Sequence, residues 1–225
     1  MATHLLTGAG SGIGAALADM LHARGDSLLL VGRSPERAGE LAERWQGAET
    51  LVADLSDPGT IAGLDLPASL DSVVHAAGAV GLGRVGELSS KEWRSQLDVN
   101  LLAPAELTRL ALPALRAARG TVVFVNSGAG LRANPDWAAY AASKHGLRAL
   151  ADALRAEERE NGVRVTSVYP GRTATPMQER VHQQEGKEYD AGEWIRAETV
   201  ADAILHALDL PRDATIPDVT VSPGP

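Results

Sequence analysis

Short apolar runs alternate with longer segments of helical periodicity along the whole chain. Most of these runs are unbroken Val and Leu rather than alternating apolar and polar residues, which is typical of strands covered on both faces. The rhythm therefore predicts repeated strand–helix units around a parallel sheet. The expected strands span residues 4–7, 27–32, 49–54, 72–76, 121–127, 163–170 and 218–222.

Helical patterns fill most of the intervening sequence, at residues 12–25, 34–45, 89–118 and 136–162. Pro104 and Pro113 are expected to bend or interrupt the third of these helical regions. The polar segment 176–196 carries two glycines between regular elements, and we expect it to form a mobile flap. No repeat, low-complexity tract or Pro/Gly-rich linker divides the chain, so we predict one α/β domain over residues 1–225.

Composition excludes several classes of function. The 225 residues include 29 acidic and 21 basic side chains and no Cys. An acidic chain without a basic run argues against nucleic-acid binding, and the lack of Cys removes disulfides, thiolate metal sites and cysteine nucleophiles. The histidines lack metal-binding spacing, and no G-x-S-x-G nucleophile elbow occurs. Since no targeting segment or run of about 18 apolar residues is present, we expect a cytoplasmic protein without metal, nucleic-acid or membrane partners.

The stretch "TGAGSGIG" follows the first expected strand and opens the first expected helix. In a parallel sheet this position offers backbone N–H groups and a helix N-terminus to a pyrophosphate. Gly8 would make the tight turn, Gly12 would let the phosphates approach, and Gly14 would let helix and strand pack closely. A merely flexible turn is the alternative, but the position of the motif favours a dinucleotide site.

The end of the second expected strand would meet the adenosine ribose in such a site. Arg33 and Ser34 stand there in place of a carboxylate. A guanidinium suits a 2'-phosphate, with the hydroxyl as a second donor, so the sequence favours NADP over NAD. Asp54 could hydrogen-bond the adenine amino group. The alternatives are that Arg33 caps a surface helix and that Asp54 caps the turn after it.

Tyr140 and Lys144 are spaced four residues apart in "YAASKHGL", so they would share one helix face. A free phenol titrates near ~10, and acid/base chemistry near neutrality needs a shift worth about 4 kcal/mol. An ammonium about 4 Å away supplies that energy at an effective dielectric of ~20. The alternative is a packed tyrosine beside a solvated lysine. Ser127, at the end of a strand, and Asn100, in a helical region, favour a reactive site, because they could bind the reacting oxygen and hold a water.

With the motifs "HAAG" at 75–78 and "PG" at 170–171, these residues form an ordered series along the chain. On this series the chain resembles the short-chain dehydrogenase/reductase family over nearly its whole length. The resemblance implies a Rossmann-type doubly wound parallel sheet with strand order 3-2-1-4-5-6-7, often assembled as homodimers or homotetramers. It also implies a nicotinamide-dependent oxidoreductase that interconverts a carbonyl and an alcohol. Arg33 and Ser34 favour NADP(H) as its cofactor, with NAD(H) possible.

The resemblance further implies residue roles. Tyr140 is the general acid/base, Lys144 lowers its pKa and binds the nicotinamide ribose, Ser127 orients the carbonyl, and Asn100 supports a proton relay. Thr175 and the Pro-Gly pair position the nicotinamide. The implied cofactor contacts are Gly8, Ser11, Gly12, Ile13, Gly14, Arg33, Ser34, Asp54, Leu55, Ala76, Ala77, Gly78, Asn100, Tyr140, Lys144, Pro170, Gly171, Thr173 and Thr175.

His75 departs from this family pattern, which usually has asparagine there, and we interpret His75 as structural. The loop 79–88 and the segment 176–196 are expected to shape the pocket for a small-molecule substrate. Trp137 and Trp194 flank the expected site, and Trp194 is a candidate substrate contact. Cellular NADPH is mostly kept reduced, which favours the reductive direction. A catalytically silent dinucleotide sensor or scaffold of the same fold is the alternative function.

Overall fold

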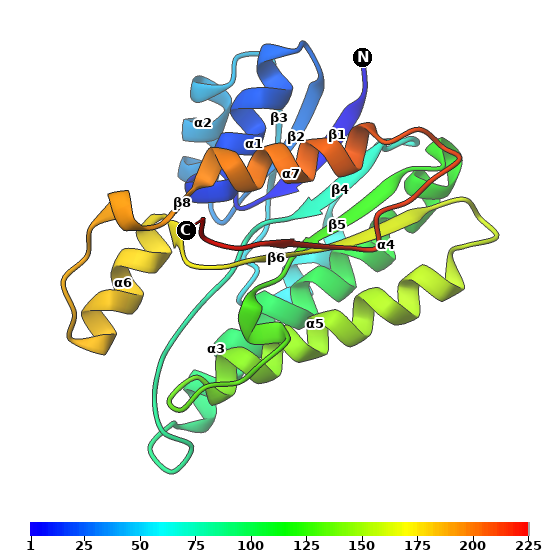
Figure 1. Cartoon of the computed structure of the whole chain (residues 1–225). Helices are drawn as coiled ribbons and strands as arrows, with labels where there is room; N and C mark the ends of the chain where they lie inside the picture. Colours follow the sequence, from blue (N-terminus) through cyan, green and yellow to red (C-terminus); the bar gives the residue numbers. More distant parts are fainter. Residues whose placement is uncertain (225) are drawn as a thin grey trace.

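Seven parallel strands form the central sheet, in the order β3-β2-β1-β4-β5-β6-β9 (Figure 1). The structure is a computed structural model that describes residues 1–224, so Pro225, the last residue of the expected domain, lies outside the described residues. This order confirms the doubly wound topology, because β9 is the seventh strand of the sheet. The strands are β1 (Thr3–Thr7), β2 (Ser27–Gly32), β3 (Glu49–Val52), β4 (Ser72–His75), β5 (Thr121–Val125), β6 (Arg164–Pro170) and β9 (Asp218–Val221).

Burial on both faces explains why the central strands have unbroken apolar sequences. Every residue of β4 and β5 is buried, so no position along them faces water. The expected strands 49–54 and 121–127 each end two residues early. As a result, Asn126 and Ser127 belong to the loop at the carboxyl edge of the sheet.

Two layers of helices cover the sheet (Figure 1). On one face, α1, α2 and α7 pack around residues such as Leu21 and Ile204. On the other face, α4 and α5 pack around residues such as Leu107 and Phe124, and α3 packs against α5. The helices are α1 (Gly12–Ala23), α2 (Pro35–Arg44), α3 (Ser90–Leu97), α4 (Ala103–Ala118), α5 (Ala138–Glu157), α6 (Pro176–Glu185) and α7 (Ala197–Asp209).

The third expected helical region, 89–118, is divided into two helices. A single π-helical turn, Asp98–Leu102, joins α3 to α4. Pro104 lies in the first turn of α4, directly after the π-helical turn, and it has no N–H to continue the series in which the Ala103 N–H donates to the Asp98 carbonyl. Pro113 lies inside α4, which continues through it. The interruption therefore coincides with Pro104 and with the turn that carries Asn100.

The segment 176–196, expected to be a flap, contains regular structure. It holds α6, a short 3-10 turn and strand β8 (Ile195–Arg196), which pairs with β7 (Thr173–Ala174) in a small separate sheet. Helix α7 follows directly and is an element that the sequence analysis did not name. Figure 1 shows α6 beside one end of the main sheet, away from both helical layers.

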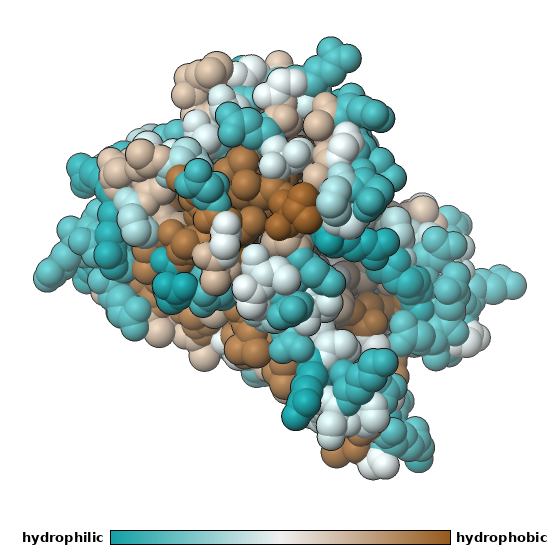
Figure 2. Space-filling view, turned by 180° about the vertical axis from the view of Figure 1, so that it is seen from behind, coloured by the Kyte–Doolittle hydropathy of each residue, from teal (hydrophilic) through white to brown (hydrophobic). Residues whose placement is uncertain are grey.

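Figure 2 shows the surface from behind the view of Figure 1. Hydrophilic residues cover its projecting parts, and apolar residues gather across the middle of this face. Of the helices in residues 1–224, none combines the length and the apolar character that crossing a membrane requires.

Candidate active site

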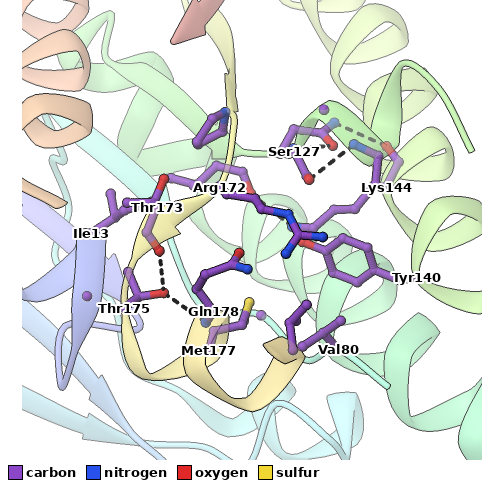
Figure 3. Close-up of a pocket in the computed structure, with 18 of the residues that line it drawn as sticks. Ile13, Val80, Ser127, Tyr140, Lys144, Arg172, Thr173, Thr175, Met177 and Gln178 are labelled. Atoms are coloured by element: carbon purple, nitrogen blue, oxygen red, sulfur yellow. Dashed lines mark hydrogen bonds between the residues drawn. The ribbon is translucent and has the colours of Figure 1, made fainter. Parts of the chain in front are cut away.

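A cavity of about 450 Å³ opens at the carboxyl edge of the sheet, between the glycine-rich loop, the strand ends and α6. Ligands of open parallel sheets bind at this edge. Figure 3 shows Ser127, Tyr140 and Lys144 on one side of the cavity, opposite Ile13 and Thr175. The predicted residues that line it are Gly8, Ser11, Gly12, Ile13, Ala76, Ala77, Gly78, Ser127, Tyr140, Lys144, Pro170, Gly171, Thr173 and Thr175.

The glycine-rich loop makes the sharp turn between β1 and α1. Gly8 has a φ of 74°, and a Cβ added there would lie 2.5 Å from the backbone nitrogen of Ala77. A Cβ on Gly14 would lie 2.3 Å from the Gly8 carbonyl oxygen, so only glycine lets α1 begin this close to β1. Ser11 precedes α1 without making a side-chain capping bond. The loop therefore offers a helix N-terminus and a hydroxyl, donors that suit an anion.

Helix α5 and the end of β5 bring Tyr140, Lys144 and Ser127 to the same cavity. Tyr140 and Lys144 lie one turn apart on α5, and their residues are only 6% and 3% exposed. The Lys144 Nζ donates to the Val125 carbonyl oxygen at 2.9 Å and lies 5.8 Å from the centroid of the Tyr140 ring. The shared helix face that the spacing predicts is therefore present, with the ammonium anchored to the strand.

Burial shifts the pKa values of both side chains, because desolvation disfavours the charged form. It raises the pKa of the Tyr140 phenol, and hydrogen bonding with the Ser127 side chain acts in the opposite direction. It lowers the pKa of Lys144 to about 8. Burial is the largest influence on the phenol pKa in this structure, and the expected lowering by Lys144 stays a prediction. At neutral pH the phenol keeps its proton, which suits a proton donor.

Asn126 is a site residue that the sequence analysis missed. Its Nδ2 donates to the Lys144 carbonyl oxygen at 3.1 Å, and its Oδ1 accepts from the Ser127 backbone N–H at 2.9 Å. One buried side chain therefore fixes α5 relative to the loop that carries Ser127. The available signal was its position directly after an apolar strand, immediately before Ser127.

Asn100 lies behind the cavity rather than on its wall. Its Oδ1 accepts from the Ala79 N–H at 2.8 Å, and its Nδ2 donates to the Ala79 carbonyl at 2.8 Å and to the Ser143 Oγ at 3.0 Å. The expected bonding to backbone is therefore present. Asn100 connects the loop after β4 to α5, and its part in a proton relay stays a prediction.

The predicted adenosine contacts also lie outside the cavity wall. Ser34 accepts from the Arg37 N–H at 3.3 Å and caps α2, while Asp54 accepts from the N–H and hydroxyl of Ser56 at 2.9 and 2.7 Å. Ser34 thus takes the helix-capping role that the sequence left open for Arg33, whereas Asp54 holds the turn at Ser56 and Asp57 caps the helical turn that follows. The predicted residues that do not line the cavity are Gly14, Arg33, Ser34, Asp54, Leu55 and Asn100.

Arg37 is a second residue that the sequence analysis missed. Its Nη2 donates to the Gly10 carbonyl oxygen at 2.9 Å, and its Nη1 pairs with the exposed Glu40. The first turn of α2 thus places a guanidinium against the glycine-rich loop, four residues after Arg33. The sequence signal that could have identified Arg37 was a second basic residue shortly after the end of β2.

The outer wall of the cavity comes from three segments that are joined to one another. The Leu82 N–H donates to the Gln184 Oε1 at 2.8 Å, which connects the loop 79–88 to α6. The Gly83 N–H donates to the Asp136 carbonyl at 2.7 Å, which connects the same loop to the segment before α5. These segments contribute Val80, Asn134, Trp137, Met177, Gln178, Arg180 and Val181 to the lining. The prediction that both segments shape the pocket is confirmed.

The two tryptophans near the site differ in their contacts. Trp137 lines the cavity and meets the Tyr140 ring edge to face, with 5.7 Å between centroids. Trp194 does not line it and packs instead against His182 and the Arg172 guanidinium, at 5.2 and 5.5 Å. The suggestion that Trp194 contacts substrate is therefore wrong for this structure.

His75 is buried within the sheet rather than in the cavity. Its Nε2 lies 2.9 Å from the Thr108 hydroxyl, and its ring stacks on Phe124 with 5.0 Å between centroids. Burial lowers the pKa of His75 to about 3, so the ring is neutral. This agrees with a structural role. Across residues 1–224, no group of three or more His, Cys, Asp or Glu side chains is placed to hold a metal ion.

Comparison with known proteins points to one family. The model of the family described as short chain dehydrogenase matches residues 2–186. The chain is 30% identical to an uncharacterized oxidoreductase of Staphylococcus epidermidis, covering 97% of the chain and 96% of that relative. It is 34% identical to dehydrogenase/reductase SDR family member 7B of Bos taurus, covering 91% and 69%.

Solved structures agree in fold. A putative NAD(P)-dependent gluconate 5-dehydrogenase from Beutenbergia cavernae, with bound NADP, is 31% identical and superposes with a TM-score of 0.83. The match covers 98% of this chain and 95% of that one.

Proposed function

The chain belongs to the short-chain dehydrogenase/reductase family, and from this premise we propose that it interconverts a carbonyl and an alcohol with NADP(H). One observation carries the proposal. Tyr140 and Lys144, buried one turn apart, share with Ser127 the wall of a cavity that also contains the glycine-rich loop. A proton donor and a nucleotide-binding element thus face one space, as carbonyl reduction requires.

In the reductive direction Tyr140 donates its phenolic proton to the carbonyl oxygen, and the Ser127 hydroxyl holds that oxygen in place. When bound, the dihydronicotinamide would supply the hydride. Lys144 stabilises the phenolate that remains and supplies the replacement proton, which a pKa of about 8 allows near neutrality. The raised pKa of Tyr140 supports this direction, because it keeps the phenol protonated.

The residues present fit a nicotinamide dinucleotide. The N-terminus of α1 and the Ser11 hydroxyl supply donors for the pyrophosphate. Pro170, Gly171 and Thr173 would hold the nicotinamide, since they line the cavity, where Figure 3 shows Thr173 across from Tyr140.

NADP(H) is favoured over NAD(H) because basic residues follow β2. Arg33 comes directly after the strand, and Arg37 reaches the glycine-rich loop from α2. Two guanidiniums suit a 2'-phosphate, whereas a free ribose diol is usually held by a carboxylate in place of Arg33. Arg33→Asp should therefore shift the ratio of kcat/KM values toward NADH, and an unchanged ratio would refute the preference.

We further propose that the single domain 1–225 assembles as a homodimer or homotetramer in the cytoplasm. The lack of Cys supports a reducing compartment. Apolar residues on the face in Figure 2, and an exposed Leu102, support an interface. Light scattering tests the assembly, and a mass equal to the 23.5 kDa monomer would contradict it.

The central experiment replaces Tyr140 by Phe and follows NADPH oxidation with a panel of aldehydes and ketones. We expect kcat to fall about 10³-fold, within the range for removing a general acid, while NADPH still binds in a fluorescence titration. Tyr169→Phe is the matched control, because Tyr169 is similarly buried but lies outside the cavity. Full activity of the Tyr140 variant would remove the proposed acid. Tight NADPH binding by the unmodified protein without any turnover would instead support the sensor.

A further inference from the structure

The charge of the cavity is opposite to that of the chain. The chain has a formal net charge of -8, yet no residue that lines the cavity is acidic. Three lining residues are cationic, namely Lys144, Arg172 and Arg180. A cleft lined by one sign of charge concentrates ligands of the opposite sign. The cofactor's pyrophosphate accounts for part of this preference, and it would lie at the glycine-rich loop, where Gly12 faces Thr175, the residue that caps α6.

Two of the three cations already have partners. The Lys144 ammonium donates to the Val125 carbonyl. The Arg172 guanidinium makes two hydrogen bonds to the Glu185 carboxylate, at 3.0 and 2.6 Å. Arg180, by contrast, has no carboxylate of residues 1–224 within ion-pair distance. Arg180 can therefore bind an anionic group of a ligand without first breaking an ion pair within the protein.

Arg180 lies on α6, in the outer wall of the cavity. It belongs to α6, together with Met177 and Gln178, which also line the cavity. Figure 3 shows Met177, Gln178 and Val80 between Tyr140 and Thr175. An anion bound by Arg180 would thus be part of the molecule whose carbonyl meets Tyr140.

The size of the cavity limits the rest of that molecule. Its volume of about 450 Å³ lies toward the lower end of the roughly 300–1,000 Å³ range of ligand pockets, and the nicotinamide has to share it. Val80, Trp137 and Met177 make the adjoining wall apolar. We propose that the substrate is a small oxo acid, or the matching hydroxy acid, whose carboxylate binds Arg180. This proposal rests on the oxidoreductase function proposed above.

The test compares 4-oxobutanoate with its methyl ester, which has the same aldehyde and lacks the charge. We expect kcat/KM to be at least tenfold higher for the acid. Arg180→Gln should abolish this preference by raising KM for the acid at least tenfold more than KM for the ester. Arg180→Lys should retain part of it. Arg132→Gln is the matched control, because it removes the same charge from an exposed residue that does not line the cavity, and it should keep the preference.

Several outcomes would overturn the assignment while leaving the oxidoreductase function intact. Equal kcat/KM values for acid and ester, reduction of neutral carbonyls alone, or a preference that survives in Arg180→Gln would each do so. A larger loss of NADPH affinity than of acid affinity would assign Arg180 to the cofactor instead.

If no carbonyl is reduced, the proposed function fails, and calorimetry still decides the anion site. Succinate should then bind the complex of protein and NADP⁺, and Arg180→Gln should weaken this binding at least fivefold, while Arg132→Gln should not. Absent or unaltered binding of succinate would overturn the site.

Discussion

The two edges of the sheet hold similar polar side chains, yet only one edge is open. At the carboxyl edge the proposed catalytic side chains line a cavity. At the amino edge, the Nδ1 of His4 lies 2.7 Å from the Ser72 hydroxyl, and its Nε2 lies 3.3 Å from the Asp26 carboxylate. A serine, a histidine and a carboxylate in this sequence of contacts would suit nucleophilic catalysis if a substrate could reach them.

No substrate can reach the amino-edge group, because Ser72 is fully buried and His4 is 3% exposed. Each member also has a structural task. His4 and Ser72 are register partners on β1 and β4, and Asp26 additionally accepts from the Ala2 N–H and pairs with Arg24. The comparison shows that residue types alone do not define a site. Reactivity requires a polar group that faces an open volume, as Ser127 and Tyr140 do at the carboxyl edge and His4 and Ser72 do not at the amino edge.

Among substitutions that compare the two edges, the largest effect should follow from Ser127→Ala at the open edge. Removing a hydroxyl that holds the reacting oxygen should lower kcat about 10²–10³-fold. The variant should stay folded, because the Ser127 hydroxyl bonds only the Ala129 N–H and the Tyr140 side chain, and each hydrogen bond is worth about 1 kcal/mol. Steady-state kinetics and thermal unfolding measure the two effects. A kcat within fivefold of the unmodified protein would show that Ser127 does not hold the substrate.

The buried His75 should make the folding stability of the protein decrease in acid. This is an effect of a polar group closed off from solvent, in contrast to the side chains that line the cavity. Its pKa of about 3 in the folded state lies below the 6.5 of the free side chain. Between these values the unfolded chain binds a proton that the folded chain does not, so stability falls as pH drops below 6.5. The cost is ~1.36 kcal/mol per pH unit, or about 2 kcal/mol between pH 6.5 and pH 5. Urea unfolding at pH 7.5 and pH 5.0 measures this loss.

His75→Asn is the control for this measurement, because it removes the titrating ring. The variant should lose about 2 kcal/mol less than the unmodified protein between the two pH values. His4, whose pKa is also lowered chiefly by burial, adds a loss of the same sign in both proteins. Equal losses of unfolding free energy in the two proteins would mean that protonation of His75 does not contribute to the destabilisation in acid.

The sheet could be predicted from sequence because its strands are covered on both faces and so consist of unbroken apolar runs. Helix α6 could not be predicted from sequence, because its residues are mostly polar. Its last turn is held by the ion pair between Arg172 and Glu185, a contact that no local sequence pattern indicates. The π-helical turn likewise carries Asn100, whose partner Ala79 is distant in sequence. Helix α7 was missed although Val200, Ala201 and Ile204 follow helical spacing, so that signal was present.

In the site too, some features could be predicted from local sequence and others depend on how the chain folds. The shared face of Tyr140 and Lys144 follows from helix geometry alone. The direction of the phenol pKa does not, because it depends on burial, which raises it, and on the hydrogen bond with the Ser127 side chain, which lowers it. Ser34 was predicted only as a donor to a 2'-phosphate, and its hydroxyl also caps α2, a contact that depends on where α2 begins.

The smallest effect should follow from Ser72→Ala, the same substitution as Ser127→Ala but at the closed edge. It leaves one buried nitrogen of His4 without its partner, while the contact of the other nitrogen with Asp26 remains. Stability should fall by about 1–1.5 kcal/mol, the usual net value of one hydrogen bond, and urea unfolding near pH 7.5 measures it. Since the change lies at the opposite end of the strands from the cavity, kcat and KM should stay within twofold. A kinetic loss approaching that of Ser127→Ala would mean that the two edges are coupled, and that the amino-edge group does more than join β1 to β4.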